Sequence, residues 1–482
     1  MSIFSLKFFA FFVLVFFAYW QCLKNKNKQN ILLLISSYVF YSFADWRMSF
    51  LLIVSTIVFY TLGVAIAQTT GKKTKTASIL TAIGFLAGIG LLFYFKYFNF
   101  FIEGFTDLAA LFGLQTGWTA KVIIFPLGVS YFSFKFISYI YEISQENINP
   151  EKDFITFASY IAFFPTITAG PIDKPQNFLP QLNKERIFEY SLAVDGCRQI
   201  LFGTLKKVVF ADNLLIAIES GTTGSTSIAL FVAVILWPIY IYMDFSGYSD
   251  IAIGIGKLLG FRVQQNFNYP YFSRNIAEYW RRWHISLTKW VTDYVFTPLN
   301  FSFRKKKKLG TIAAILINFL VIALWHEGSS RYILFGIYNA ILFIPIILCN
   351  KLLDHEEMSY TRFGLPVFRH FLAILGTYCL ICVGNFILFF TDFAEVFQFT
   401  ARLFQPENGF FSIDSIHGKK VILGLIALFT IEWISFKNKM EYGFCLVTKI
   451  KSNVIRYAVY IALSILVLYF IGGDTKFVYE GF

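Results

Sequence analysis

The chain has 482 residues, of which 57% are hydrophobic, 20% are aromatic and only 15% are charged. Soluble globular domains carry about 25% charged residues, so this composition excludes an ordinary soluble domain and predicts a polytopic membrane protein. The formal net charge is +13. Its basic residues fall in short clusters between apolar segments, which is typical of topology signals and not of a nucleic-acid-binding face.

Apolar runs long enough to cross a bilayer, which takes about 20 helical residues, recur along the chain. They are 3–22, 48–67, 77–97, 122–141, 331–350, 371–391, 419–436 and 453–472. Shorter or interrupted runs are 31–45, 153–168, 208–219, 228–260 and 309–327. This pattern predicts an all-α protein with roughly 11 to 13 transmembrane or re-entrant helices. The first run lacks a small-residue cleavage pattern, so we interpret it as a retained helix and not as a signal peptide.

A single threading can place every basic cluster on the cytoplasmic side of the membrane, as the positive-inside rule requires. The clusters are Lys24/Lys26/Lys28, Lys72/Lys73/Lys75, Arg304 to Lys308 and Lys437/Lys439. This threading puts both termini outside. It also requires residues 142–207 and 261–308 to stay cytoplasmic or re-entrant, because they are too broken for clean crossings.

Two of the interrupted stretches contain unusual polar chemistry. Segment 164–171 combines prolines with a glycine, which predicts an interruption of the helix. Segment 244–250 places two carboxylates and three hydroxyls inside an apolar run. Asp244 and Asp250 are about 600° apart around a helix, so we do not expect them to act as one pair. They are either structural hydrogen-bonding groups, or one of them orients a catalytic histidine.

Two of the five histidines lie in the most polar membrane-associated stretches. His326 follows Trp325 near the end of an apolar run, and His284 follows Arg281 and Arg282. Because a polar imidazole is costly inside a bilayer, we interpret this pattern as an intramembrane reaction site. The alternatives are a packing histidine bonded to a carbonyl for His326, and an interfacial helix touching lipid headgroups for His284.

Other kinds of site have little support in the sequence. The six cysteines are scattered, and Cys379 and Cys382 are interpreted as small packing residues. We find no metal-ligand cluster, phosphate-binding loop or nucleophilic serine elbow, so no metal or resident cofactor is predicted. His355, His370 and His417 are predicted to have surface or interface roles.

Four motifs follow one another through the polar core of the chain. They are MDFSGYSDIAIG at 243–254, WRRWHISLTKW at 280–290, DYVFTPL at 293–299 and LWH at 324–326. They resemble those of the membrane-bound O-acyltransferases, and within them the bacterial alginate and peptidoglycan O-acetyltransferases. The resemblance runs from about residue 30 to the C-terminus. It implies helices around a central funnel or tunnel, in which a cytoplasmic acyl donor meets an acceptor presented from outside.

The resemblance implies one domain, 1–482, for the whole chain. Its expected parts are N-terminal helices at 1–145, a catalytic core with re-entrant segments at 146–330, C-terminal helices at 331–472 and an extracytoplasmic aromatic tail at 473–482. The family's near-invariant histidine corresponds to His326, and its second histidine region to His284. One departure is Glu327, where the family commonly has glycine, and this carboxylate either orients the imidazole or faces solvent.

The predicted activity is acetyl transfer from cytoplasmic acetyl-CoA for O-acetylation of an exported cell-wall polysaccharide, either peptidoglycan, which we favour, or an alginate-like polymer. His326 is the expected general base. Arg281 and Arg282 are expected to bind the phosphates of the donor. The candidates for contacts to the oxyanion at the thioester carbon are Asn266, Asn268, Trp325 or free amides near Gly170. Asp244 is a further candidate for contact with donor or substrate.

The tail adds Tyr479, which either carries the acetyl group transiently or docks an extracytoplasmic serine esterase-like partner. Its alternative role is that of an interfacial aromatic that anchors the last helix. Two other functions stay open: a transporter or channel with an intramembrane His/Arg path, and a lipid-directed acyltransferase. The absence of a detectable internal repeat argues against the transporter.

Overall fold

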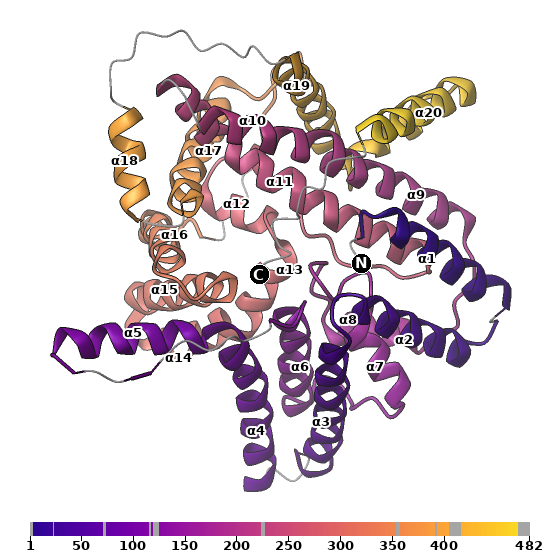
Figure 1. Cartoon of the computed structure of the whole chain (residues 1–482), viewed down its shortest axis with the longest axis vertical. Coiled ribbons are helices and arrows are strands. Elements are labelled where there is room, and N and C mark those ends of the chain that lie inside the picture. The colour runs from indigo at the N-terminus through magenta and orange to yellow at the C-terminus, as the bar shows by residue number, and fades with distance from the viewer. Residues whose placement is uncertain are drawn as a thin grey trace. The chain divides into compact units, whose positions relative to one another are not determined.

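The computed structural model describes residues 3–22, 24–70, 74–114, 117–118, 125–222, 227–352, 357–390, 393–403 and 416–470. Within these ranges the regular structure is helical, apart from one isolated β-bridge between Tyr360 and Pro366 (Figure 1). The all-α prediction is therefore confirmed. The described residues form two compact units, 3–197 with 252–264 and 198–251 with 265–470, called unit 1 and unit 2. The predicted single domain and its internal boundaries stay predictions.

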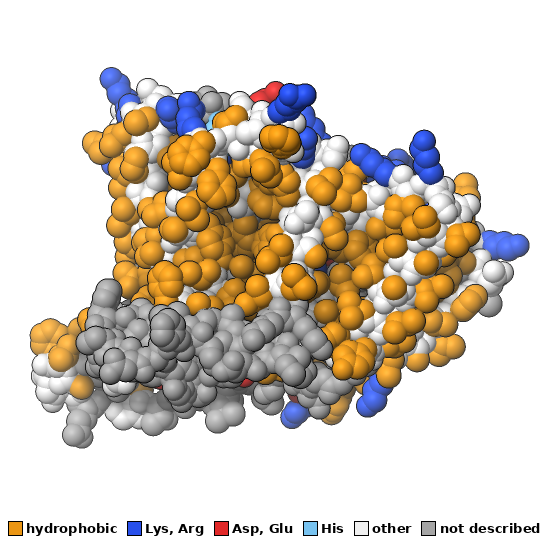
Figure 2. Space-filling view, turned by 90° about the horizontal axis from the view of Figure 1, so that it is seen from above, with side chains coloured by type: hydrophobic (Ala, Val, Ile, Leu, Met, Phe, Trp, Pro, Cys, Tyr) orange, Lys and Arg blue, Asp and Glu red, His pale blue; other side chains and the backbone are white. Residues whose placement is uncertain are grey.

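Seven helical segments of the described chain are long and apolar enough to cross a membrane. They are Trp46–Thr69, Lys75–Leu111, Leu230–Leu258, Arg304–His326, Ser330–Leu348, Phe368–Phe389 and Asn453–Phe470. Many of their large hydrophobic side chains are exposed, among them Leu86, Phe371 and Ile461. On the face shown in Figure 2, hydrophobic side chains predominate and Lys and Arg side chains stand mostly at its margins. The chain is a multi-pass membrane protein.

Unit 1 is built from the first helices of the chain. Its elements are α1 (Leu6–Phe17), η1 (Ala18–Cys22), α2 (Lys26–Ser42), α3 (Trp46–Thr70), α4 (Lys75–Leu92), η2 (Phe93–Tyr97), α5 (Phe98–Leu111), α6 (Val129–Ser144), α7 (Phe154–Ala162), α8 (Pro175–Leu182) and the first part of α9 (Tyr190–Thr204). The predicted break at 164–171 is confirmed, because the chain is non-helical between α7 and α8. Lys135 stabilises the end of α7 by donating to the carbonyl of Tyr160 at 2.9 Å.

The predicted span at 122–141 was wrong in its start, and the helix that forms there faces protein on nearly all sides. α6 begins only at Val129, after Pro126 and after Gly128, which has a φ of 73°. A side chain at Gly128 would clash with the carbonyl oxygen of Ile167, so this turn requires glycine. Nearly every side chain of α6 is buried within the protein. Hydropathy alone does not distinguish a helix buried in protein from one buried in lipid.

Unit 2 contains the remaining elements. They are the end of α9, η3 (Leu205–Ala211), α10 (Asp212–Thr222), most of α11 (Ser227–Leu258), η4 (Pro270–Phe272), α12 (Ile276–Arg282), α13 (Ile285–Val291), η5 (Thr292–Phe296), α14 (Thr297–Ser302), η6 (Arg304–Lys306), α15 (Lys307–His326), α16 (Ser330–Leu348), α17 (Phe368–Phe389), α18 (Phe393–Leu403), α19 (Ile416–Lys437), η7 (Gly443–Lys449) and α20 (Asn453–Phe470). α15 packs against α13 and α16, and α16 packs against α12 and α17. This packing brings the polar motifs together.

Two helices, α15 and α11, which lies mostly in unit 2, are more regular than the sequence predicted. The runs 228–260 and 309–327 were expected to be short or interrupted, yet α11 is a continuous helix of 32 residues and α15 one of 20. The polar block of α11 does not break the helix because its two carboxylates form ion pairs with lysines, as described below. By contrast, the stretch 261–308, which the sequence predicted to be broken, forms only short elements up to the start of α15 at Lys307.

Candidate active site

His284 occupies a strained position between two short helices of unit 2. α12 starts after Asn275, whose side-chain oxygen accepts a hydrogen bond from the amide of Glu278 at 2.8 Å. His284 then links α12 to α13 with a φ of 42° and a ψ of 54°, in the left-handed region. This conformation costs a residue with a side chain roughly 1–2 kcal/mol. Such strain persists only where the surrounding structure fixes the backbone.

Asn266 fixes the backbone next to His284. Its carbonyl oxygen accepts a hydrogen bond from the amide of Ile285 at 2.8 Å, and its side-chain oxygen accepts one from the hydroxyl of Ser286 at 2.5 Å. Its side-chain nitrogen donates to the hydroxyl of Ser249 on α11 at 3.1 Å. Asn266 is buried. This geometry favours a positioning role for Asn266 over the substrate contact that the sequence suggested.

The ring of His284 is buried among aromatic side chains. Only 1% of the residue is exposed, and its ring lies edge-on to those of Phe245 and Trp325, with centroids 4.8 Å and 5.7 Å away. Neither ring nitrogen has a hydrogen-bond partner in the part of the chain that the structure describes. Burial lowers the pKa of His284 to about 3, so the imidazole is neutral at physiological pH. A buried polar group without a partner costs roughly 1–3 kcal/mol, which points to a chemical role.

His326 is the last residue of α15 and lies beside the same tryptophan. Its ring centroid is 4.8 Å from that of Trp325, and it stacks on Tyr332 at 5.7 Å with an interplanar angle of 18°. His326 is 9% exposed. The structure therefore brings both histidines into contact with Trp325. Glu327 forms an ion pair with Arg331 at 2.7 Å.

A network of buried ion pairs holds the two aspartates of α11. Lys207 contacts Asp244 at 2.6 Å and Asp212 at 2.8 Å. Its neighbour Lys206 contacts Asp250 at 3.2 Å and Glu432 of α19 at 3.3 Å. The prediction that Asp244 and Asp250 do not form a pair is confirmed. Because Asp244 is fully buried and ion-paired, the geometry favours a structural role for it over substrate binding.

The two lysines of this structural network were not predicted from the sequence. Lys206 and Lys207 are consecutive in the apolar element η3, and both are buried. Two adjacent lysines inside an apolar segment are themselves a signal, since each needs a counter-charge when it is buried. The sequence shows that a partner is needed but not which carboxylate supplies it.

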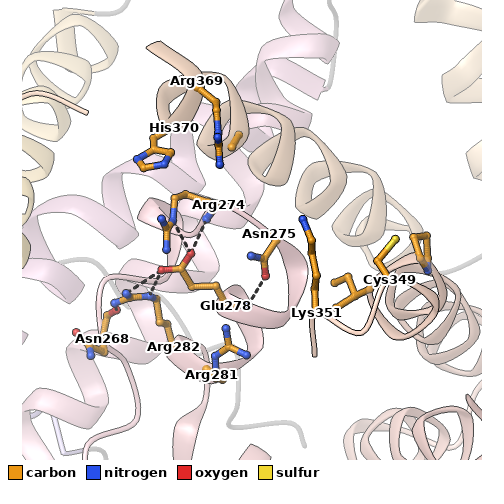
Figure 3. Close-up of a pocket in the computed structure, with 13 residues that line it drawn as sticks. Asn268, Arg274, Asn275, Glu278, Arg281, Arg282, Cys349, Lys351, Arg369 and His370 are labelled. Atoms are coloured by element: carbon orange, nitrogen blue, oxygen red, sulfur yellow. Dashed lines mark hydrogen bonds and ion pairs between the residues drawn. The ribbon is translucent and has the colours of Figure 1, made fainter. Parts of the chain in front are cut away.

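Arg281 and Arg282 line a pocket of about 670 Å³ that we call the cationic pocket (Figure 3). Its charged lining residues are Arg274, Glu278, Arg281, Arg282, Lys351 and Arg369. Glu278 lies between two of them, with its carboxylate 3.1 Å from the Nε of Arg274 and 2.9 Å from the Nη2 of Arg282. Burial raises the pKa of Glu278, but the hydrogen bonds and charges of these two arginines outweigh it and hold the pKa below its usual value. The pocket thus has a large excess of positive charge.

Two further residues of this pocket differ from their expected roles. Asn268 belongs to it and not to the histidine cluster, and its carbonyl accepts a hydrogen bond from Arg282 at 3.2 Å. His370, for which a surface or interface role was predicted, is not a surface residue, because it is buried and its Nδ1 accepts a hydrogen bond from the amide of Ser359 at 3.1 Å. Tyr479 and His355 lie outside the described residues.

The family model for membrane-bound O-acyltransferases matches residues 38–384, a range that includes both histidines, Asn266 and the cationic pocket. The chain belongs to the membrane-bound O-acyltransferase family. This confirms the resemblance seen in the motifs and, at the level of the family, the prediction of an O-acyltransferase.

Three relatives show which members of the family this chain is similar to. The probable alginate O-acetylase of Pseudomonas aeruginosa is 34% identical over 345 residues, which cover 70% of this chain and 64% of that protein. The peptidoglycan O-acetyltransferase of Helicobacter pylori is 29% identical over 69% of this chain and 66% of its own length. The teichoic acid D-alanyltransferase of Bacillus subtilis is 29% identical over 54% of this chain and 68% of its own length. The match therefore spans less than two thirds of the alginate and peptidoglycan enzymes named here.

Proposed function

We propose that this membrane-bound O-acyltransferase moves an acetyl group from cytoplasmic acetyl-CoA to a hydroxyl of an exported cell-envelope polysaccharide. The observation that carries the proposal is the cluster of His326, Trp325 and His284 in unit 2, with His326 at the end of an apolar helix. The names of the relatives, alginate O-acetylase and peptidoglycan O-acetyltransferase, support a polysaccharide acceptor.

In this mechanism His326 is the general base. Its neutral imidazole accepts the proton of the acceptor hydroxyl as that oxygen attacks the thioester carbon. The carbon–sulfur bond then breaks, and the departing thiolate takes the proton from the imidazolium. Positioning of the hydroxyl, the carbonyl and the base in one buried site supplies much of the rate enhancement.

His284 has the properties of a contact to the oxyanion that forms at the thioester carbon. A neutral imidazole offers one N–H donor, and the ring of His284 is held at a fixed angle between Phe245 and Trp325. A donor that is already oriented and shielded from water stabilises a developing negative charge effectively. The low proton affinity that burial gives His284 makes it unsuited to serve as the base.

The cationic pocket is the proposed site for the phosphates of the donor. Arginine guanidinium groups bind phosphate oxygens with paired hydrogen bonds, and this pocket offers Arg281 and Arg282 beside Arg274 and Arg369. The alternative is a headgroup anchor, in which the same arginines contact membrane lipids. Loss of these arginines would then leave the use of acetyl-CoA unchanged.

The later fate of the acetyl group is a further part of the proposal. In the bacterial inner membrane, with both termini outside, Tyr479 either accepts the acetyl group transiently or docks an extracytoplasmic serine esterase-like partner. Tyr479→Phe keeps the ring and removes the hydroxyl. The relay requires that this variant lose activity and that the wild type yield an acetylated Tyr479 peptide.

The acceptor is tested by mass spectrometry of envelope polymers from a deletion strain. Wild-type protein added back should restore O-acetyl groups on peptidoglycan, which the sequence analysis favoured, or on an exported uronate polymer. His326→Ala and His326→Gln should restore neither, although both reach the membrane in normal amounts. Restoration of D-alanyl esters or of acylated lipid instead would overturn the proposal.

Family membership already favours an enzyme over a transporter.

A further inference from the structure

The segment that leads into α17 forms a small hairpin at residues 359–367, which we call the 359–367 hairpin. Its two arms are paired by the bridge between Tyr360 and Pro366 and by hydrogen bonds from the amides of Val367 and Thr361 to the carbonyls of Ser359 and Leu365. The amide of Gly364 also donates to the carbonyl of Thr361 at 2.9 Å, which closes a turn with Arg362 and Phe363 at its centre. Arg362 and Phe363 therefore form the tip of the hairpin.

The hairpin is fixed to two helices of unit 2. The indole nitrogen of Trp433 on α19 donates to the carbonyl of Gly364 at 3.2 Å, and the amide of Ser359 donates to the Nδ1 of His370 on α17 at 3.1 Å. Gly364 has a φ of 76°, which a residue with a side chain rarely adopts, so this turn favours glycine. The tip is thus held in place by contacts with both helices.

Apolar side chains at and beside the tip are exposed. Phe363 is 90% exposed, and Leu365 and Phe368 are 57% and 75% exposed. Contact with water costs roughly 25 cal/mol for each Å² of apolar surface, so a flexible loop would fold such a ring onto the protein. Here the paired arms prevent this. A cluster of exposed apolar side chains on a rigid support marks an interaction surface.

The place of the hairpin in the chain puts it at the membrane surface. It runs directly into α17, which is a candidate span. Arg369 of α17 and Lys351, which follows α16, line the same cationic pocket, so both spans have this end on one side. Lys308 donates to the carbonyl of Leu348, the last residue of α16, at 2.6 Å. This end therefore lies beside the basic cluster Arg304 to Lys308, which the positive-inside rule assigns to the cytoplasmic side.

The chemistry of the tip fits the boundary between headgroups and acyl chains. The amides of Arg362 and Phe363 have no hydrogen-bond acceptor among the described residues, so they need water or polar headgroups and cannot lie in the hydrocarbon core. The ring of Phe363 is apolar, whereas the guanidinium of the exposed Arg362 favours phosphate. The sequence from Met358 to Phe390 contains no Asp or Glu, so the charge of Arg362 has no counter-charge within this segment.

We infer that the 359–367 hairpin is an interfacial anchor for an anionic phospholipid. The ring of Phe363 enters the headgroup boundary of the cytoplasmic leaflet, and the guanidinium of Arg362 binds the lipid phosphate. This contact fixes the depth of the start of α17, where Arg369 lines the cationic pocket. The inference does not depend on acetyl transfer, because it concerns a surface outside the histidine cluster.

The test is photocrosslinking of the purified full-length protein with a benzophenone-bearing phenylalanine in place of Phe363. The protein is reconstituted into nanodiscs of equal parts phosphatidylcholine and phosphatidylglycerol, and the adducts are identified by mass spectrometry. Lipid adducts should form, with phosphatidylglycerol favoured about fivefold, which is the effect of one arginine near an anionic surface. The same probe in place of Phe371, half-exposed on α17, is the positive control, and in place of Gln145, exposed in unit 1, the negative control. Lipid adducts from the Phe371 probe without any from the Phe363 probe would overturn the inference.

A variant of Arg362 tests the headgroup contact. In protein that carries the probe at position 363, Arg362→Gln should abolish the preference for phosphatidylglycerol while lipid adducts persist. Its side chain is exposed, so folding should be normal, and thermal unfolding checks this. The matched control is Lys449→Gln, which removes an exposed positive charge outside the hairpin and should leave the preference unchanged. A fivefold preference that survives in Arg362→Gln would overturn the inference.

A soluble protein partner is the competing occupant of this surface. The Phe363 probe is therefore also irradiated in the membranes of intact cells. Lipid adducts there would support the anchor. Adducts to one protein in their place would identify a docking surface for that protein and overturn the inference.

Discussion

Unit 2 contains two buried polar regions that are stabilised in opposite ways. In the ion-pair network around α11, Asp244 and Asp250 of that helix and Glu432 of α19 each contact a lysine. The ring nitrogens of His284 are equally buried, yet they meet no partner among the described residues, and the backbone there is strained. A buried charge with its counter-charge connects helices, whereas an unpaired polar group on a strained backbone destabilises the fold and is retained for another reason. The comparison separates the scaffold from the reaction site.

The largest expected effect is that of His326→Ala on catalysis. Loss of the general base should reduce acetyl transfer about 10²- to 10⁴-fold. The change leaves only a small cavity, so insertion and folding should be normal. Turnover is measured with purified protein in liposomes, and thermal unfolding serves as the control. Wild-type turnover in His326→Ala or His326→Gln would contradict the base assignment.

Lys207→Met should affect folding more than catalysis, the reverse of His326→Ala. It leaves Asp244 as a fully buried charge without its lysine, which should lower the stability by about 3–5 kcal/mol. The amount of folded protein in the membrane and its melting temperature measure this loss. Adding Asp244→Asn should restore part of the stability, because the stranded charge is removed. An unchanged melting temperature in Lys207→Met would show that the pair does not hold α11.

His284→Phe tests the other half of the comparison. The phenyl ring keeps the contacts with Phe245 and Trp325 and removes two unpaired nitrogens, so the stability should be unchanged or higher by about 1 kcal/mol. Acetyl transfer should nevertheless fall about 10²-fold if His284 stabilises the oxyanion. A stable variant with normal turnover would return His284 to a packing role.

The pH dependence of stability should also distinguish the wild type from His284→Phe. The pKa of His284 falls from 6.5 to about 3 on burial, so the folded state resists protonation. Stability is therefore complete above the unfolded pKa and is lost as the pH falls below it, by about 1 kcal/mol per pH unit. Melting temperatures between about pH 7.5 and pH 5 should drop less steeply in His284→Phe than in the wild type. Parallel curves would contradict a buried neutral histidine.

The smallest effect is expected for Arg281→Gln. Arg281 is exposed and donates to the carbonyl of Leu352, so its loss should leave folding unchanged. If it contacts the phosphates of the donor, the KM for acetyl-CoA should rise about tenfold with little change in kcat. Lys289→Gln, an exposed change on α13, is the control. An unchanged KM would favour the role of a headgroup anchor.

The sequence predicted the parts of this molecule that depend on local pattern. The motifs located His284, Arg281, Arg282 and His326, and apolar runs located the long helices. Lys206 and Lys207 were missed because their partners on α11, Asp250 and Asp244, lie tens of residues away, so this pairing depends on tertiary packing. The burial of His370 and the positioning role of Asn266 were not predicted for the same reason. The hydrogen bonds of Asn266 join three segments of the chain.

The continuity of α11 has a consequence for the bilayer itself. A helix of 32 residues is about 48 Å long, whereas the hydrocarbon core of a typical membrane is about 30 Å thick. An upright α11 would extend beyond this core, and full immersion would require a tilt at or beyond the usual range of roughly 0–40°. Membranes of different thickness therefore impose different tilts, or different exposed ends, on the helix that carries Asp244 and Asp250.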